Sequence, residues 1–145
     1  MENGKKTVTL TIGWIMLLVL GVLMTLGGLE SLLFAYRSGN EAPAGVSMQE
    51  LSRTNPELPV ALRGRRATAA TLAVTSGILI AWIAAVAYRR GEKWAWWALL
   101  CSIGFGAGLS ILRISLLGTR LGAGAAAFVL IWAIVALAIS YRDMR

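Results

Sequence analysis

The stretch that decides the fold runs from Val8 to Tyr36 and has the sequence VTLTIGWIMLLVLGVLMTLGGLESLLFAY. Glu30 is its only charged residue. A helix that crosses the hydrocarbon core of a bilayer needs roughly 20 predominantly apolar residues. This run is longer than that, and much longer than the apolar core of a signal peptide, which has about 7–15 residues. We therefore predict a retained membrane helix over residues 8–36, with excess length that tilts or emerges from the lipid.

Three more apolar runs follow in a chain of 145 residues. Hydrophobic residues make up 57% of the chain, and its mean hydropathy of +0.70 exceeds that of a soluble domain. We predict further helices over about 59–88, 94–117 and 121–140. The short turn Arg89–Lys93 makes the second and third helices antiparallel neighbours. The predicted fold class is an all-α membrane protein, a four-transmembrane-helix antiparallel bundle that forms one domain over residues 1–145.

The only polar stretch of any size is the first loop, residues 37–58. Within it, Ser47-Met48-Gln49-Glu50 is a capping-box pattern, in which the Ser47 hydroxyl and the Glu50 carboxylate satisfy free backbone amides. We predict a short amphipathic helix over Met48–Arg53, lying on the bilayer or capping the bundle. The second long helix should begin near Pro59 and carry Arg63, Arg65 and Arg66 on its interfacial turns.

The net charge of +7 comes from Lys and Arg residues that lie mostly at the ends of apolar stretches. There they contact lipid phosphates and set the topology, so we predict a lipid-bilayer partner and no nucleic acid. The chain has no histidine, which removes the commonest ligand for metals and haem and the commonest general base. We predict no metal, no cofactor and no catalytic residue. Cys101 should be a small buried residue.

The orientation in the membrane follows from the distribution of positive charge. An even number of helices puts both termini on one side. Lys5 and Lys6 precede the first helix, and Arg89–Lys93 is a short, dense basic loop. Because positively charged short loops stay inside, we predict a multi-pass protein with both termini in the cytoplasm.

Tryptophans mark one predicted membrane boundary. Trp94, Trp96 and Trp97, with Tyr88 across the loop, should be interfacial anchors at headgroup level. The alternative is a tryptophan-lined ligand site.

Two charged residues lie inside apolar runs, Glu30 in the first and Arg113 in the third. These two helices run in the same direction, so both charges should lie at similar depth near the outer face. An unpaired charge in a membrane helix costs up to about 2.5–3.5 kcal/mol. We predict an ion pair or a shared hydrogen-bond network between them, or snorkelling of both to the headgroups. The functional alternative is a proton- or cation-coupled site.

Small residues predict where helices approach closely. Gly104 and Gly108 form one small-xxx-small pair, and Gly118 and Gly122 repeat the spacing at the next turn. Glycine exposes backbone for van der Waals contact, which drives association in lipid. We predict that these glycines pack within the bundle, with dimerisation as the alternative.

The segments Ser47–Leu51 and Asn55–Leu58, followed by the turn RRGEKWAWW at residues 89–97, carry a resemblance. Together they resemble a group of small bacterial four-helix membrane proteins with a polar first loop and an RRGExWAWW turn. The resemblance implies a bacterial cytoplasmic-membrane location and an outward-facing first loop. It implies no activity.

Three functions are compatible with these features. The first is a non-enzymatic accessory subunit or interaction bundle, whose partners are other membrane-protein subunits or a second copy. The second is a small proton-coupled transporter or a binder of lipid or another hydrophobic ligand, using Glu30 and Arg113. The third, an enzyme acting on lipid or quinone with Glu30 as base, ranks last because the sequence supplies no nucleophile–base pair or metal site.

Overall fold

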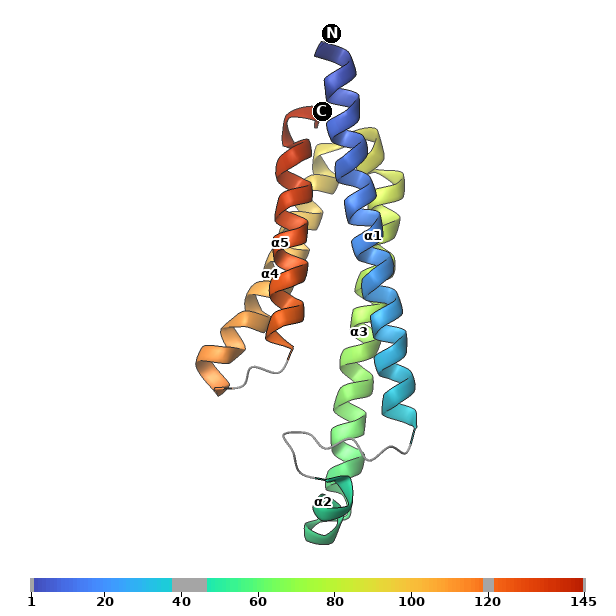
Figure 1. Ribbon diagram of the computed structural model, residues 1–145, viewed down its shortest axis with the longest axis vertical. Coiled ribbons are helices and arrows are strands. Elements are labelled where there is room, and N and C mark those ends of the chain that lie inside the picture. The colour runs from blue at the N-terminus through green and yellow to red at the C-terminus, as the bar shows by residue number, and fades with distance from the viewer. Residues whose placement is uncertain (1, 38–46, 119–121, 145) are drawn as a thin grey trace. The chain divides into compact units, whose positions relative to one another are not determined.

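The computed structural model describes residues 2–37, 47–118 and 122–144, and in these ranges the chain is helical without any strand (Figure 1). This confirms the predicted all-α fold class, including the short helix in the first loop. The elements are α1 Glu2–Tyr36, α2 Met48–Thr54, α3 Leu58–Val86, η2 Tyr88–Arg90, α4 Lys93–Leu117, α5 Ala123–Ser140 and η3 Tyr141–Asp143. Leu121, where we expected the last long helix to begin, lies outside the described residues.

Four helices are long and apolar enough to cross a membrane, and the chain is a multi-pass membrane protein. The spans are Val8–Tyr36, Leu58–Arg90, Lys93–Leu116 and Ala123–Asp143. Helix α1 starts at Glu2, before the apolar run, and has 35 residues. At 1.5 Å per residue it is about 52 Å long, well beyond a hydrocarbon core of about 30 Å.

Helix α2 and the start of α3 are capped by side chains of the first loop. The Ser47 Oγ accepts a hydrogen bond from the Glu50 backbone nitrogen at 3.1 Å, which is half of the predicted capping box. Leu51 is half-buried, whereas Glu50 and Arg53 are exposed, so α2 is amphipathic. The Asn55 Oδ1 accepts from the Glu57 nitrogen at 2.9 Å and forms the turn that leads into α3.

The described residues form two compact units. One, here called the terminal unit, comprises Met1–Val22 and Ile78–Arg145; the other, here called the loop unit, is Leu23–Gly77. Helices α1 and α3 each contribute to both. The prediction of one domain over residues 1–145 concerns how the two units sit together, and it stays a prediction.

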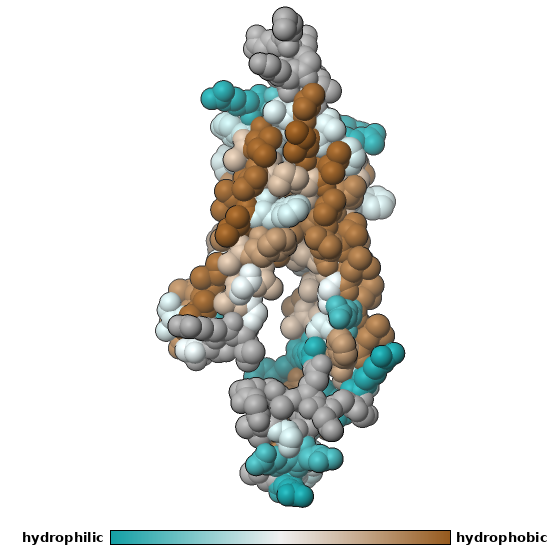
Figure 2. Space-filling model, in the orientation of Figure 1, coloured by the Kyte–Doolittle hydropathy of each residue, from teal (hydrophilic) through white to brown (hydrophobic). Residues whose placement is uncertain are grey.

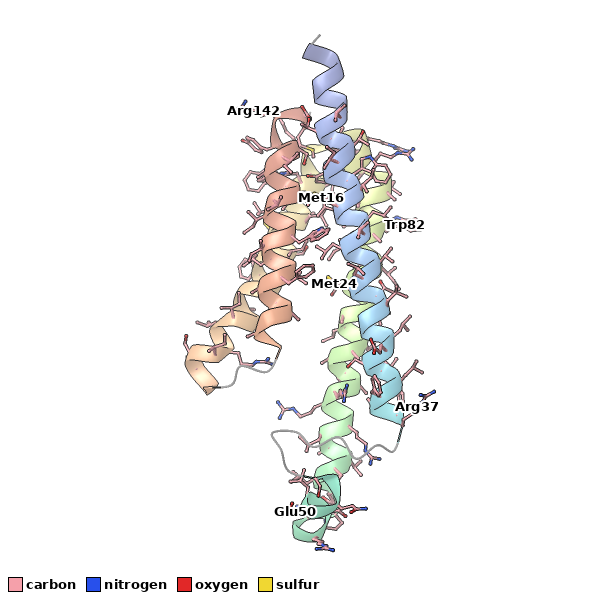
Figure 3. All side chains as sticks on the ribbon, viewed as in Figure 1. Met16, Met24, Arg37, Glu50, Trp82 and Arg142 are labelled. Carbon is pink, nitrogen blue, oxygen red and sulfur yellow. The ribbon has the colours of Figure 1, made fainter. Side chains whose placement is uncertain are left out.

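The core of the terminal unit is built on a seam along α4. Ala95, Leu99, Ile103 and Ala107 are buried and recur every four residues, so they share one helix face. Two indole groups tie the neighbouring helices together. Trp96 Nε1 donates to the Leu137 carbonyl of α5 at 3.0 Å, and Trp132 Nε1 of α5 donates to the Met16 carbonyl of α1 at 2.9 Å. Figure 3 labels Met16 on the stretch of α1 that takes part in this contact.

The loop unit brings α1 and α3 together at a glycine. A Cβ built on Gly28 would lie 2.8 Å from Val74 Cγ2, 2.9 Å from the Val74 nitrogen and 3.1 Å from the Ala70 carbonyl oxygen. Only a residue without a side chain fits there. Further along α3, Thr71 and Thr75 each donate from Oγ1 to the carbonyl four residues earlier, at 2.9 and 3.0 Å. These bonds satisfy hydroxyl groups that would otherwise be unpaired in lipid.

Apolar side chains cover the outer surfaces of the helices, as the brown colour in Figure 2 shows. Trp82 is 69% exposed and points away from α3 (Figure 3). The prediction that Cys101 is buried is wrong, because its side chain is exposed on α4. In a membrane helix both the packed face and the lipid face are apolar, so an apolar neighbourhood in the sequence does not indicate burial.

Candidate functional site

A buried polar layer joins α5 to η2, the short helix that follows α3, in the terminal unit. The hydroxyls of Tyr88 and Ser140 are hydrogen-bonded to each other, and both side chains have 0% exposure. Ser140 Oγ also donates to the Ala136 carbonyl at 2.7 Å. Because serine has a single hydroxyl proton, the Tyr88 hydroxyl is the donor and Ser140 Oγ its acceptor.

Two glycines allow the surrounding backbone to close on this layer. A Cβ built on Gly13 of α1 would lie 2.6 Å from Ser140 Oγ, and one on Gly91 would lie 3.3 Å from the Asp143 carbonyl oxygen. Thr9 Oγ1 in turn donates to the Asp143 carboxylate. The layer therefore links the first span to the turn before α4 and to the C-terminal end of the chain.

The position of the Tyr88 side chain differs from our expectation. We expected it to face the headgroups beside the tryptophans, but it is fully buried in the protein. Tyr141, at the end of α5, is 59% exposed. The sequence signal that was available is Ser140, a lone hydroxyl at the end of an apolar helix, because a buried tyrosine hydroxyl needs such a partner.

Replacing Tyr88 with phenylalanine should lower the free energy of unfolding by about 0.6–1.7 kcal/mol, from the average to the largest value measured for hydrogen bonds inside a membrane protein. Ser140→Ala should cost more, because it leaves the buried Tyr88 hydroxyl without an acceptor. The matched control is Tyr141→Phe, at an exposed position, with an expected change within about 0.5 kcal/mol. Unfolding of the detergent-solubilised protein by SDS measures all three. Equal effects of Tyr88→Phe and Tyr141→Phe would contradict the assignment.

The two charged residues predicted inside the spans lie in different units. Glu30 is exposed on α1 in the loop unit, and Arg113 is exposed on α4 in the terminal unit. An ion pair between Glu30 and Arg113 would connect the two units, and it stays a prediction. Within the terminal unit, Arg113 Nη2 lies 3.5 Å from a Cβ built on Gly122, which places its guanidinium beside the start of α5.

The four predicted packing glycines fall into two groups. Gly118 and Gly122 have φ of 64° and 76°, and they cap the end of α4 and the start of α5. Their left-handed backbone explains glycine at both positions. Gly104 and Gly108 are helical, and among the described residues no atom outside their own stretch of α4 lies within 4 Å of a Cβ built on either. Their packing role stays a prediction.

Gly13 and Gly28 make close interhelical contacts in the structure, and neither was predicted as a packing residue. Gly13, Gly21, Gly28 and Ala35 are all buried and recur along α1 at intervals of seven or eight residues. This spacing keeps small residues on one face of a helix, and it is the sequence signal that could have identified them.

The three tryptophans predicted as interfacial anchors differ in exposure. Trp94 and Trp97 are each 56% exposed, and the Trp94 indole donates to the Glu92 carboxylate. Trp96 is half-buried against α5, with its ring centroid 4.9 Å from that of Trp97 and 5.2 Å from that of Tyr141. Trp96 thus packs within the unit, and the anchoring role of Trp94, Trp96 and Trp97 stays a prediction.

Beside its buried seam, α4 carries exposed small residues and a charge. Ser102, Gly106 and Arg113 are exposed and are separated by four and seven residues, which keeps them near one side of the helix. Helix α4 is also the least buried of the four spans. In its most apolar stretch 17% of the residues are buried, against 28% for α1. We call the exposed residues Ser102, Gly106, Leu109 and Arg113 the α4 outer face.

The described residues contain no group of three or more Cys, Asp or Glu side chains that could hold a metal ion. The chain matches no protein-family model, no curated protein and no solved structure. Its function must therefore be argued from its own residues.

Proposed function

We propose that this protein is a non-enzymatic interaction bundle or accessory subunit of a bacterial cytoplasmic membrane, with both termini in the cytoplasm. The partner is another membrane protein or a second copy of the chain. The α4 outer face is the observation that supports this proposal, because its exposed residues include small side chains together with a charged one.

A face that contacts lipid and a face that contacts another helix favour different side chains. A surface that contacts only lipid gains nothing from glycine or serine, whereas a helix–helix contact gains close backbone approach and van der Waals packing. Ser102 and Gly106 on one side of α4 therefore support a protein partner.

Replacing Gly106 with leucine should dissociate the assembly, because the added side chain blocks close approach of a helix. A Cβ on Gly106 meets no described atom within 4 Å, so the single chain should still fold. The measurement is native mass spectrometry of the protein extracted with its native lipid. Gly124→Leu is the matched control, since Gly124 on α5 is equally open. A protein that is monomeric before substitution, or loss of assembly in both variants, would contradict the proposal.

The alternative is a small proton-coupled transporter or a binder of lipid or another hydrophobic ligand that uses Glu30 and Arg113. The observation in its favour is that Glu30, the one carboxylate of the Val8–Tyr36 span, is exposed on α1. The same mass measurement separates the two functions. A monomer or homodimer that retains a small molecule favours the alternative, and an assembly with other chains favours the interaction bundle.

A further inference from the structure

One turn of α3 in the loop unit carries three arginines, Arg63, Arg65 and Arg66. Arg63 and Arg66 are half-buried, whereas Arg65 is exposed. Residues three apart lie on the same side of a helix, so Arg63 and Arg66 share a side that Arg65 does not. Contacts of Arg66 with α1 identify this side as the one that packs on the first span.

Helix α1 holds the Arg66 guanidinium through two contacts. Arg66 Nε donates to Ser31 Oγ at 3.3 Å, and the guanidinium carbon lies 5.7 Å from the centre of the Phe34 ring, within the range of a cation–π interaction. A hydrogen bond and a ring contact together restrict the plane of the guanidinium. A side chain that is already oriented loses less conformational entropy when it binds a ligand.

We propose that Arg63 and Arg66 bind the phosphate of an anionic phospholipid, with Ser31 and Phe34 as positioning residues. Guanidinium groups match phosphate oxygens in a bidentate geometry that a lysine cannot reproduce. Arginine side chains at the end of a membrane span reach the headgroup level, where they can contact lipid phosphates. This site is independent of the proposed interaction bundle and of the α4 outer face.

The surroundings favour a lipid over a free anion. The arginines belong to the first turns of the Leu58–Arg90 span, where we expect the helix to leave the bilayer. A phospholipid gains burial of its acyl chains against the apolar helix of this span, whereas a soluble phosphate does not.

The test measures which lipid the full chain retains. The purified protein is delipidated in detergent and mixed with phosphatidylglycerol or phosphatidylcholine of equal acyl chains, and bound lipid is counted by native mass spectrometry. We expect preferential retention of phosphatidylglycerol. Arg66→Lys should reduce this preference about fivefold, although it keeps the charge, because the bidentate contact is lost. Arg65→Lys is the matched control and should leave the preference unchanged.

Several results would overturn the site. Equal effects of Arg65→Lys and Arg66→Lys would indicate charge attraction without a defined site, as would no effect of either. Displacement of the lipid by inorganic phosphate would indicate a site for free anions instead. Ser31→Ala should lower the preference while Ser31→Thr, which keeps the hydroxyl, should retain it. If Arg66→Lys does not fold, by circular dichroism and gel filtration, Arg63→Lys takes its place with the same expected loss.

Discussion

Replacing Gly28 with alanine is expected to lower the free energy of unfolding by about 1–3 kcal/mol, the usual cost of forcing extra atoms into a packed site. The added methyl would lie 2.9 Å from the Val74 nitrogen and 3.1 Å from the Ala70 carbonyl oxygen. Both are backbone atoms of α3, so no side-chain rotation relieves the contact. Helices α1 and α3 of the loop unit must move apart, and the van der Waals contact that holds them in lipid is lost.

The chain supplies a matched control at the preceding position. Gly27→Ala makes the same chemical change in the same helix, but a Cβ on Gly27 meets no described atom within 4 Å. Because alanine is the better helix former, this variant should be neutral or slightly more stable. SDS unfolding followed by tryptophan fluorescence compares the two. If both variants lose the same stability, the effect arises from helix propensity or lipid contact, and the close approach at Gly28 is not energetically important.

The number and position of the membrane spans could be predicted because the bilayer imposes a simple length requirement on apolar runs. The four expected helices and the structural spans differ mainly at their ends. Helix α1 extends back to Glu2, where the residues are polar and hydropathy gives no reason to expect regular structure. Capping of α2 by Ser47 was also predictable, because it depends on residues only three apart in the chain.

Which side chains are buried could not be predicted in the same way. In a soluble helix, polarity distinguishes the outer face from the core face, but lipid is as apolar as a protein core. Leu17 is fully buried and Val19 is 40% exposed, although both are aliphatic residues in one uniform stretch. The misplacement of Cys101 and Tyr88 has this same physical cause.

The geometry of the candidate site could not be predicted from the sequence. Gly118 and Gly122 were predicted from their spacing as packing residues, and that role stays a prediction; their positive φ could not be predicted from the spacing. Trp96 was grouped with Trp94 and Trp97 by sequence proximity, yet it turns inward to bond the Leu137 carbonyl. Contacts of this kind depend on which helix lies opposite, and that information is distributed over the whole chain.

Replacing Gly13 with alanine is the second substitution with a large expected effect, again about 1–3 kcal/mol. Its Cβ would lie 2.6 Å from Ser140 Oγ, 2.9 Å from Ser140 Cβ and 3.1 Å from the Ala136 carbonyl oxygen. Ser140 cannot simply rotate away, because its hydroxyl is bonded to Ala136 and to Tyr88. The substitution therefore disturbs the polar layer as well as the packing of α1 on α5.

A second substitution shows whether this steric contact is the cause. Ser140→Gly removes both Ser140 atoms near the new methyl, so Gly13→Ala should cost less in the Ser140→Gly background than in the natural chain. The difference is the coupling energy of a double-mutant cycle, and neighbouring residues typically show about 0.5–3 kcal/mol. Gly104→Ala, where a Cβ meets no described atom within 4 Å, controls for the general effect of adding a methyl to a span. Additive costs at positions 13 and 140 would mean that α1 does not approach Ser140 closely, and the polar layer would then join only η2 and α5.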